Sequence, residues 1–186
     1  MPATISTERW TYEDMVEKLP AESRYELRDY NLLEMPAPKP KHQNIVFTIG
    51  KQLDSYVREN KLGKIFISPL DVVFQKGDSV QPDLIFVATE NLHIIKESYI
   101  SGVPDLLVEV VSKGSVARDY VEKKNDFEKF GVKEYWIIDS LNETIWIYAQ
   151  NEDVKYELFS YAEEGEKALS KLFPDFSLDH DLIFEE

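Results

Sequence analysis

"PDLLVEVVSKGS", residues 104–115, has the composition of a β-strand that is covered on both faces. Its apolar run, from residue 106 to residue 111, is interrupted only by Glu109. Because side chains alternate along a strand, Glu109 shares a face with Leu107 and Val111. An ionised carboxylate in such surroundings is unfavourable unless it is paired, protonated or bound to a cation. The stretch therefore predicts a buried sheet and a carboxylate with a special role.

The segments around this strand predict one domain with a mixed α/β fold, in which helices cover the faces of a mixed sheet. Apolar residues at helical spacing predict long helices over 42–60 and 115–130, the second ending at Gly131 as a C-terminal cap. Shorter helices are expected over 6–20 and 89–100. Strands are predicted over residues 24–36 (as a long strand or an extended pair), 63–74, 81–87, 104–111, 134–140, 143–150 and 156–161. The core is expected over about residues 24–150, with C-terminal strands and a tail over 151–186.

The composition excludes several kinds of site. The chain has 186 residues and no cysteine, which excludes disulfides, thiolate zinc sites and cysteine nucleophiles and favours a reducing cytoplasm. No apolar run approaches the roughly 20 residues of a membrane helix, and residues 1–10 lack the pattern of a signal peptide. We therefore expect a cytoplasmic protein with no membrane partner.

The charge balance limits the ways in which this chain can meet nucleic acid. Its formal net charge of −14, from 35 acidic and 21 basic residues, argues against a protein that coats nucleic acid nonspecifically. The charge leaves open an enzyme that meets phosphate in one local cleft through a metal ion. Residues 113–133, shortly after Glu109, run against the trend with six basic and four acidic residues.

A second carboxylate, Asp83, stands at the start of another apolar strand in "QPDLIFV". Two neighbouring strands can thus aim one carboxylate each at a common point, and Mg²⁺ is held by one or two carboxylates with water and substrate phosphate. Alternatively, Glu109 is the ion-pair partner of Arg118 or Lys123, and Asp83 is a turn residue after a proline. Asp105 is a third candidate, for which a turn role is the stronger expectation.

The helix after the glutamate strand adds a lysine to these acids. Filling the gap in its apolar stripe places Lys123 where a core hydrophobe is expected, because the stripe comprises Val116, Tyr120, Phe127 and Phe130. The ammonium is either directed at an anionic group, exposed at the end of a buried stem, or paired with Asp119 four residues earlier. Two carboxylates and a lysine suit metal-assisted hydrolysis of a phosphodiester.

The order and spacing of several motifs resemble the Uma2 (Uma-two) family, which belongs to the PD-(D/E)XK nuclease superfamily. The resemblance covers roughly residues 10–150. It depends on "YEL" at 25–27 with Asp29 just after, "PAPKPKHQ" at 36–43, "SPLDV" at 68–72, "QPDLIFV" at 81–87, "GVPDLLVEVVS" at 102–112, and "RDYVEK" at 118–123 followed by "FGVKEYWIID" at 130–139.

The resemblance implies a restriction-endonuclease-like αβββαβ core and a nuclease that hydrolyses phosphodiester bonds, with DNA as the expected substrate. It implies that Asp83 and Glu109 bind a divalent metal, expected to be Mg²⁺ with Mn²⁺ as a substitute. Glu26, in "YEL", falls on a recurrent acid of the family and is a candidate to complete the metal shell. Taken alone, Glu26 would be one more exposed strand residue.

The catalytic lysine implied by the resemblance is not at the position of the general signature. That signature has a lysine two residues after its second acid, where this chain has Val111. In the Uma2 family the following helix carries a D-x-x-x-K pattern, which here is Asp119 and Lys123. Lys113 is a rival, although the family usually has proline there.

Two other family positions carry expectations. Tyr30 stands where the family usually has glycine, which questions the geometry of the turn after Asp29. His42 and Gln43 open the long helix and could contact phosphate or water, but an N-terminal capping role is the stronger expectation.

Three functions remain in competition. The leading interpretation is a Mg²⁺-dependent endonuclease whose catalytic residues are Asp83, Glu109, Lys123 and Glu26. The alternatives are an inactive nuclease-fold protein with a binding or regulatory role, and a metal-dependent hydrolase of small phosphate esters. We also expect a homodimer, for which a candidate face comprises Trp146, Tyr148, Tyr156, Phe159 and Tyr161.

Overall fold

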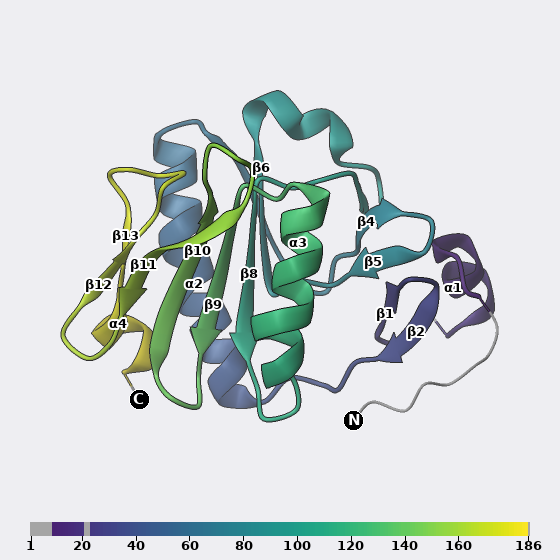
Figure 1. Ribbon diagram of the computed structural model, residues 1–186, viewed down its shortest axis with the longest axis horizontal. Helices are drawn as coiled ribbons and strands as arrows, with labels where there is room; N and C mark the ends of the chain where they lie inside the picture. The colour runs from purple at the N-terminus through teal and green to yellow at the C-terminus, as the bar shows by residue number, and fades with distance from the viewer. Residues whose placement is uncertain (1–8, 21–22, 186) are drawn as a thin grey trace.

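The computed structural model describes residues 9–20 and 23–185 and contains a large, a smaller and a two-stranded sheet (Figure 1). The large sheet has the strand order β11-β10-β9-β8-β6-β3. Its strands are β3 (Gly63–Ile67), β6 (Leu84–Ala88), β8 (Leu106–Val111), β9 (Glu134–Asp139), β10 (Thr144–Gln150) and β11 (Tyr156–Ala162). Strand β8 is parallel to β9 and antiparallel to β6, so the sheet is mixed, as predicted.

Strand β8 is buried because helices cover both faces of the large sheet (Figure 1). Helix α2 (Pro40–Glu59) covers one face and shares an apolar core with Val108. Helix α3 (Lys124–Phe130) lies on the other face, where the core includes Leu107. Each fully buried Val or Leu side chain stabilises the fold by about 1.5–3 kcal/mol. The alternation of the strand directs Glu109 to the α3 face.

The smaller sheet has the order β2-β1-β5-β4-β7 and lies beside helix α1 (Tyr12–Lys18) (Figure 1). Its strands are β1 (Tyr25–Arg28), β2 (Asn31–Glu34), β4 (Val72–Gln75), β5 (Asp78–Val80) and β7 (Ile100–Ser101). The single strand predicted over 63–74 is wrong, because β3 and β4 belong to different sheets. Pro69, which has no N–H for a ladder, lies where the chain passes from one sheet to the other.

The hairpin β1–β2 shows how the chain accommodates tyrosine in place of the family's usual glycine. Asp29 and Tyr30 both have positive φ, at 47° and 64°, as the tight turns of hairpins require. This conformation costs a non-glycine residue roughly 1–2 kcal/mol. The Tyr30 ring gains contacts in return. Arg9 Cζ lies 4.1 Å from the ring centroid. The ring also packs so closely on Gly77 that a Cβ at this glycine would stand 2.6 Å from a ring atom.

The helix predicted over 115–130 is confirmed, and Gly131 ends it in the left-handed conformation with φ 92°. One turn, η2 (Arg118–Lys123), is π-helical. The predicted stripe is wrong at Val116, which is exposed. The buried line instead runs through Ser115, Asp119, Lys123 and Phe127. The buried side chains recur every four residues because a π turn contains more residues than an α-helical turn. The sequence pattern does not indicate this π turn.

The C-terminal segment closes the α2 face of the large sheet. Its elements are β12 (Lys167–Leu169), β13 (Ser177–Asp179) and α4 (His180–Phe184), and its buried side chains join the core of α2. A short 3₁₀ helix, η1 (Thr89–Ile94), occupies part of the segment where a short helix was expected. In the part of the chain that the structure describes, no helix has the length and apolar character needed to cross a membrane.

Candidate functional site

Two carboxylates meet at one end of strands β6 and β8. Leu84 pairs with Val108 in this antiparallel ladder; Asp83 directly precedes the first of these residues and Glu109 directly follows the second. The Asp83 carboxyl turns onto β8, where it accepts the backbone N–H of Val110, the residue after Glu109. The side chains of Asp83 and Glu109 are almost completely buried. The structure therefore brings together the two acids that the sequence analysis singled out.

Lys123 joins these acids from the π turn. Its Nζ lies 2.6 Å from Oε1 of Glu109 and 2.9 Å from Oε1 of Glu26, and the side chain is only 4% exposed. Burial opposes the charge on this ammonium, but the two carboxylates outweigh that effect and raise the pKa of Lys123. Among the described residues Lys123 forms its ion pairs with these acids and not with Asp119. Its head is not solvent-exposed, so the snorkelling alternative is wrong.

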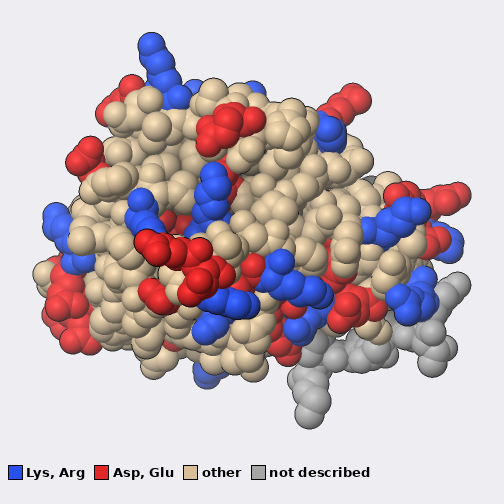
Figure 2. Space-filling view, turned by 45° about the horizontal axis from the view of Figure 1, so that its top comes forward, with Lys and Arg blue, Asp and Glu red and all other residues tan. Residues whose placement is uncertain are grey.

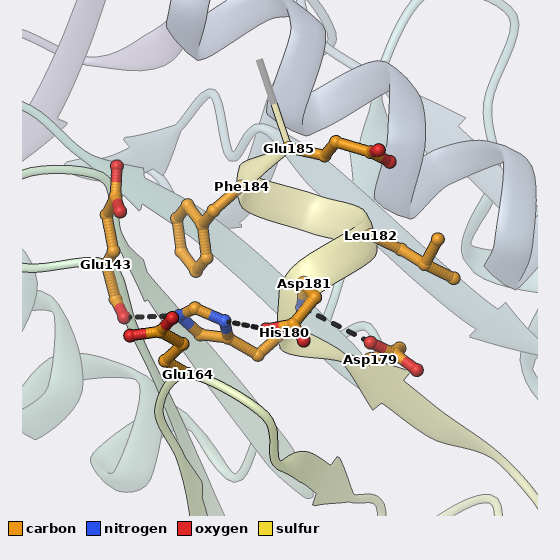
Figure 3. A pocket seen from close by; sticks show the side chains of 8 residues that line it. All are labelled: Glu143, Glu164, Asp179, His180, Asp181, Leu182, Phe184 and Glu185. Carbon is orange, nitrogen blue, oxygen red and sulfur yellow. Dashed lines mark hydrogen bonds and ion pairs between the residues drawn. The ribbon is translucent and has the colours of Figure 1, made fainter.

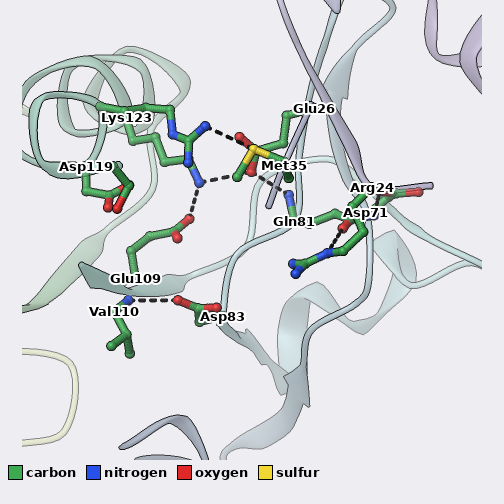
Figure 4. Close-up of polar contacts among 12 residues, drawn as sticks. Arg24, Glu26, Met35, Asp71, Gln81, Asp83, Glu109, Val110, Asp119 and Lys123 are labelled. Atoms are coloured by element: carbon green, nitrogen blue, oxygen red, sulfur yellow. Dashed lines mark hydrogen bonds and ion pairs between the residues drawn. The ribbon is translucent and has the colours of Figure 1, made fainter. Parts of the chain in front are cut away.

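Glu26 reaches the same point from the smaller sheet, as Figure 4 shows. It is buried, so its interpretation as an exposed strand residue is wrong. Its Oε1 accepts hydrogen bonds from Lys123 and, at 3.1 Å, from the backbone N–H of Gln81. Burial alone would raise the pKa of Glu26, but Lys123 and Arg118 hold it below its usual value. The cluster thus lies where the two sheets meet.

A further set of polar residues supports Glu26 and was missed from sequence. Gln81, whose N–H binds Glu26, also donates its side-chain N–H to Oδ1 of Asp71 at 3.0 Å. The Tyr12 hydroxyl donates to the other oxygen of Asp71 at 2.8 Å. These partners are 10 and 59 residues apart in sequence. No local pattern could have paired them.

Asp83 is held from two sides. Its Oδ2 accepts the backbone N–H of Val110 at 2.8 Å and lies 3.1 Å from Nε2 of His42. His42 therefore contacts the acidic cluster, and the expected capping role is wrong. The N-cap of α2 is Lys39, which makes no side-chain capping bond. Gln43, the other residue named with His42, is exposed.

The cluster carries more acid than its cations neutralise. Burial raises the pKa of Glu109 well above its usual value; Lys123 opposes this, and Asp83 adds to it by repulsion. Burial also raises the pKa of Asp119, whose Oδ1 is enclosed without a hydrogen-bond partner in the described part of the chain. Such a cluster either retains protons or fits an added cation.

Asp83 and Glu109 each keep one carboxylate oxygen without a hydrogen-bond partner among the described residues. Oδ1 of Asp83 and Oε2 of Glu109 accept no hydrogen bond from any described residue, and neither is among the fully enclosed polar atoms. The described residues contain no group of three or more His, Cys, Asp or Glu side chains arranged to hold a metal. A metal held here would therefore depend on two carboxylates, with water and substrate oxygens, which is a donor set that Mg²⁺ accepts.

Two other candidates lie apart from this cluster. Lys113 is exposed and has no described contact with the acids. Asp105 is buried at the start of β8, where it accepts the N–H of Ala88 at 2.7 Å and pairs with Lys133 at 2.7 Å. Asp105 therefore anchors the loop before the strand, in line with the structural role expected of it.

Two surface features outside the cluster bear on phosphate binding. Figure 2 shows a face on which basic side chains lie among acidic ones rather than in one basic area. A hollow near the C-terminus is ringed by acids, and its His180 is bonded to the backbone oxygen of Glu143 and to Asp181 (Figure 3). Five of the eight residues that line this hollow are acidic, so it is a poor place for phosphate.

Most of the chain is similar to a known protein family and to a solved structure. A family model described as "Uma2: Putative restriction endonuclease" matches residues 11–181. The fold resembles the crystal structure of a putative nuclease belonging to DUF820 from Anabaena variabilis ATCC 29413, with a TM-score of 0.76 and 18% identity over 94% of this chain and 97% of that chain. At this identity the likeness establishes the fold, which confirms the predicted fold class. A comparison with curated proteins finds no match.

Proposed function

Since the chain belongs to the Uma2 putative restriction endonuclease family, we propose that it is a divalent-metal-dependent nuclease that hydrolyses phosphodiester bonds in DNA. The observation that supports this best is the convergence of Asp83, Glu109 and Lys123 in one buried cluster. Stability alone does not account for it, because a carboxylate pair in an apolar sheet repels itself and is poorly hydrated. Buried carboxyls whose pKa values are shifted, as burial shifts that of Glu109, are common at catalytic sites.

Each side chain has a role in this proposal. Asp83 and Glu109 would hold the ion, expected to be Mg²⁺ with Mn²⁺ as a substitute, through their unpartnered oxygens. When bound, the ion polarises the phosphoryl oxygens and lowers the pKa of a water molecule. Lys123, which stays protonated, stabilises the negative charge that builds on the phosphoryl group. Glu26 keeps that ammonium in place through its 2.9 Å contact.

Cleavage assays with matched variants test this function. Wild type is incubated with plasmid, single-stranded DNA, RNA and bis(p-nitrophenyl) phosphate, in Mg²⁺, in Mn²⁺ and in chelator. We expect metal-dependent DNA cleavage that Asp83→Asn and Glu109→Gln both abolish and that Glu90→Gln, at an exposed acid, retains. Cleavage that survives chelation, or that persists in Glu109→Gln, would contradict the proposal.

The second candidate is an inactive nuclease-fold protein with a binding or regulatory role. It is favoured by the net charge of −14 and by the ion pair that already occupies Oε1 of Glu109. This candidate predicts no cleavage of any substrate and no shift of the melting temperature with Mn²⁺. Cleavage of bis(p-nitrophenyl) phosphate alone would instead indicate a hydrolase of small phosphate esters.

The proposed nuclease would act as a homodimer through the outer edge of the large sheet. Of the five aromatic residues expected at a dimer face, three pack against the core instead: Trp146, Tyr148 and Tyr156. The other two, Phe159 and Tyr161, are exposed on β11, the last strand of that sheet, together with Leu158. Such apolar edge strands are the usual template for pairing with another chain. A second copy of this chain would allow each protomer to cut one strand of a duplex.

A further inference from the structure

The guanidinium of Arg118 has few hydrogen-bond partners among the described residues. Its Nη1 donates to the sulfur of Met35 at 3.0 Å, and its Nε is enclosed without any hydrogen-bond partner in the described part of the chain. A guanidinium has five donors, and a thioether is a weak acceptor. By contrast, Arg28 pairs with both Glu122 and Asp126. Arg118 therefore keeps most of its donor capacity unused.

Arg118 lies beside acids with which it forms no ion pair among the described residues. With Lys123, its charge holds the pKa of Glu26 down against burial, and it opposes the rise that burial causes in the pKa of Asp119, so the guanidinium lies close to the acidic cluster. It nevertheless forms no ion pair with any described acid; Glu26 is bound to Lys123 instead. Enclosing a donor such as the Arg118 Nε without an acceptor is unfavourable, and an anion bound to the guanidinium would offset that cost.

The backbone directs Arg118 toward the reaction centre. It is the first residue of the π turn, and Lys123 is the last, five residues later. Residues at this spacing lie above one another, because a π turn closes bonds between residues i and i+5. The guanidinium and the catalytic ammonium are thus neighbours on one side of the helix. An anion bound by the first would lie beside the second.

We propose that Arg118 binds a phosphate of the DNA backbone next to the bond that is cut, an inference that rests on the proposed function. The planar fork of a guanidinium matches two phosphate oxygens, and such charge-assisted bonds are roughly twice as strong as neutral ones. The overall charge of −14 repels DNA, so binding requires local positive groups, and Arg118 supplies one of them. Its role is to position the phosphate for Lys123 and the metal acids.

The competing explanation is that Arg118 is structural, packing its stem on Met35 and offsetting the charge of Glu26. The two explanations predict opposite orders for two variants. Arg118→Met retains an apolar stem without charge, whereas Arg118→Lys retains a cation that can meet phosphate. A phosphate-binding role requires lysine to be the better replacement; a packing role requires methionine to be at least as good.

The test is the salt dependence of DNA binding. A short fluorescein-labelled duplex is titrated with protein in Ca²⁺, its integrity is checked, and fluorescence anisotropy gives the affinity at several salt concentrations. We expect Arg118→Met to reduce the slope of log K against log salt by about 0.9, the value of one phosphate contact, and Arg118→Lys to keep the wild-type slope. Between 50 and 200 mM salt, wild type then loses about 3.5-fold more affinity than Arg118→Met. Arg58→Met, which removes the same charge at an exposed ion pair, is the control and should keep the slope.

Each contrary outcome has a distinct meaning. An unchanged slope in Arg118→Met, with wild type still binding DNA, overturns the role of Arg118 and leaves the nuclease proposal standing. An equal fall in slope for Arg58→Met overturns it as well, because the effect is then one of overall charge. If wild type neither binds nor cleaves the duplex, the nuclease proposal fails and the role of Arg118 fails with it.

Discussion

Replacement of Lys123 by methionine tests whether the buried lysine holds the acidic cluster together. Methionine keeps an unbranched stem of similar length, so the cavity term is small and the change mainly removes charge. Two bonds to carboxylates are lost, at 2.6 and 2.9 Å. At roughly 1.5–3 kcal/mol for each bond to a charged group, the loss is about 3–6 kcal/mol. Breaking a buried ion pair typically costs about 3–5 kcal/mol, so we expect the free energy of unfolding to fall by about 4 kcal/mol near neutral pH.

The pH dependence of this loss distinguishes electrostatics from packing. Lys123 holds the pKa of Glu26 down against burial and opposes the rise that burial causes in the pKa of Glu109, so without Lys123 both carboxyls have higher folded-state pKa values. A carboxyl whose pKa is raised on folding contributes stability below its unfolded pKa, and this contribution is lost as pH rises through its folded pKa. The penalty of Lys123→Met should therefore be smaller at about pH 5 than at about pH 8.

Urea denaturation followed by tryptophan fluorescence measures these free energies, since Trp136 is fully buried. Lys113→Met is the matched control: its lysine is exposed, and the change should stay within about 0.5 kcal/mol. A loss below about 1 kcal/mol for Lys123→Met, or a penalty that grows as pH falls, would refute the account of the cluster.

The remaining predictions concern the metal acids, the strand anchor and the edge strand. Glu109→Gln removes the group whose pKa burial raises, so its stability should decline less than that of wild type between about pH 5 and pH 8, and it should abolish any shift of the melting temperature by Mg²⁺ or Mn²⁺. Asp105→Ala leaves the Ala88 N–H without its partner and Lys133 unpaired, and should cost about 3 kcal/mol in urea denaturation while the metal-induced shift persists. Phe159→Glu should convert a dimer into a monomer in light scattering without changing the melting temperature of the monomer; a wild type that is already monomeric would rule out the dimer.

Alternation and stripe patterns predicted the central features of the cluster. A carboxylate inside a fully apolar strand is visible in sequence, and so is a lysine on a buried helical stripe. Neither pattern gives the partner. The ladder that brings Asp83 next to Glu109 joins segments more than 20 residues apart. The position of Glu26 depends on the meeting of two sheets, which no local spacing encodes.

The failed predictions have specific physical causes. Val116 was placed on the buried stripe because ordinary helical spacing was assumed, whereas the π turn shifts the buried line to Ser115 and Asp119. His42 lies near the start of α2, where a capping residue is expected, but its side chain instead contacts Asp83, just before strand β6. The segment 63–74 is predicted as one strand because apolar residues dominate both of its halves, although Pro69 marks the point where the chain changes sheets.

Crystals soaked in Mn²⁺ and measured at the manganese absorption edge examine the central claim most directly. The account predicts an anomalous peak between the free oxygens of Asp83 and Glu109 in wild type, and its loss in Glu109→Gln. A wild-type crystal at saturating Mn²⁺ with no peak between these oxygens would contradict the claim.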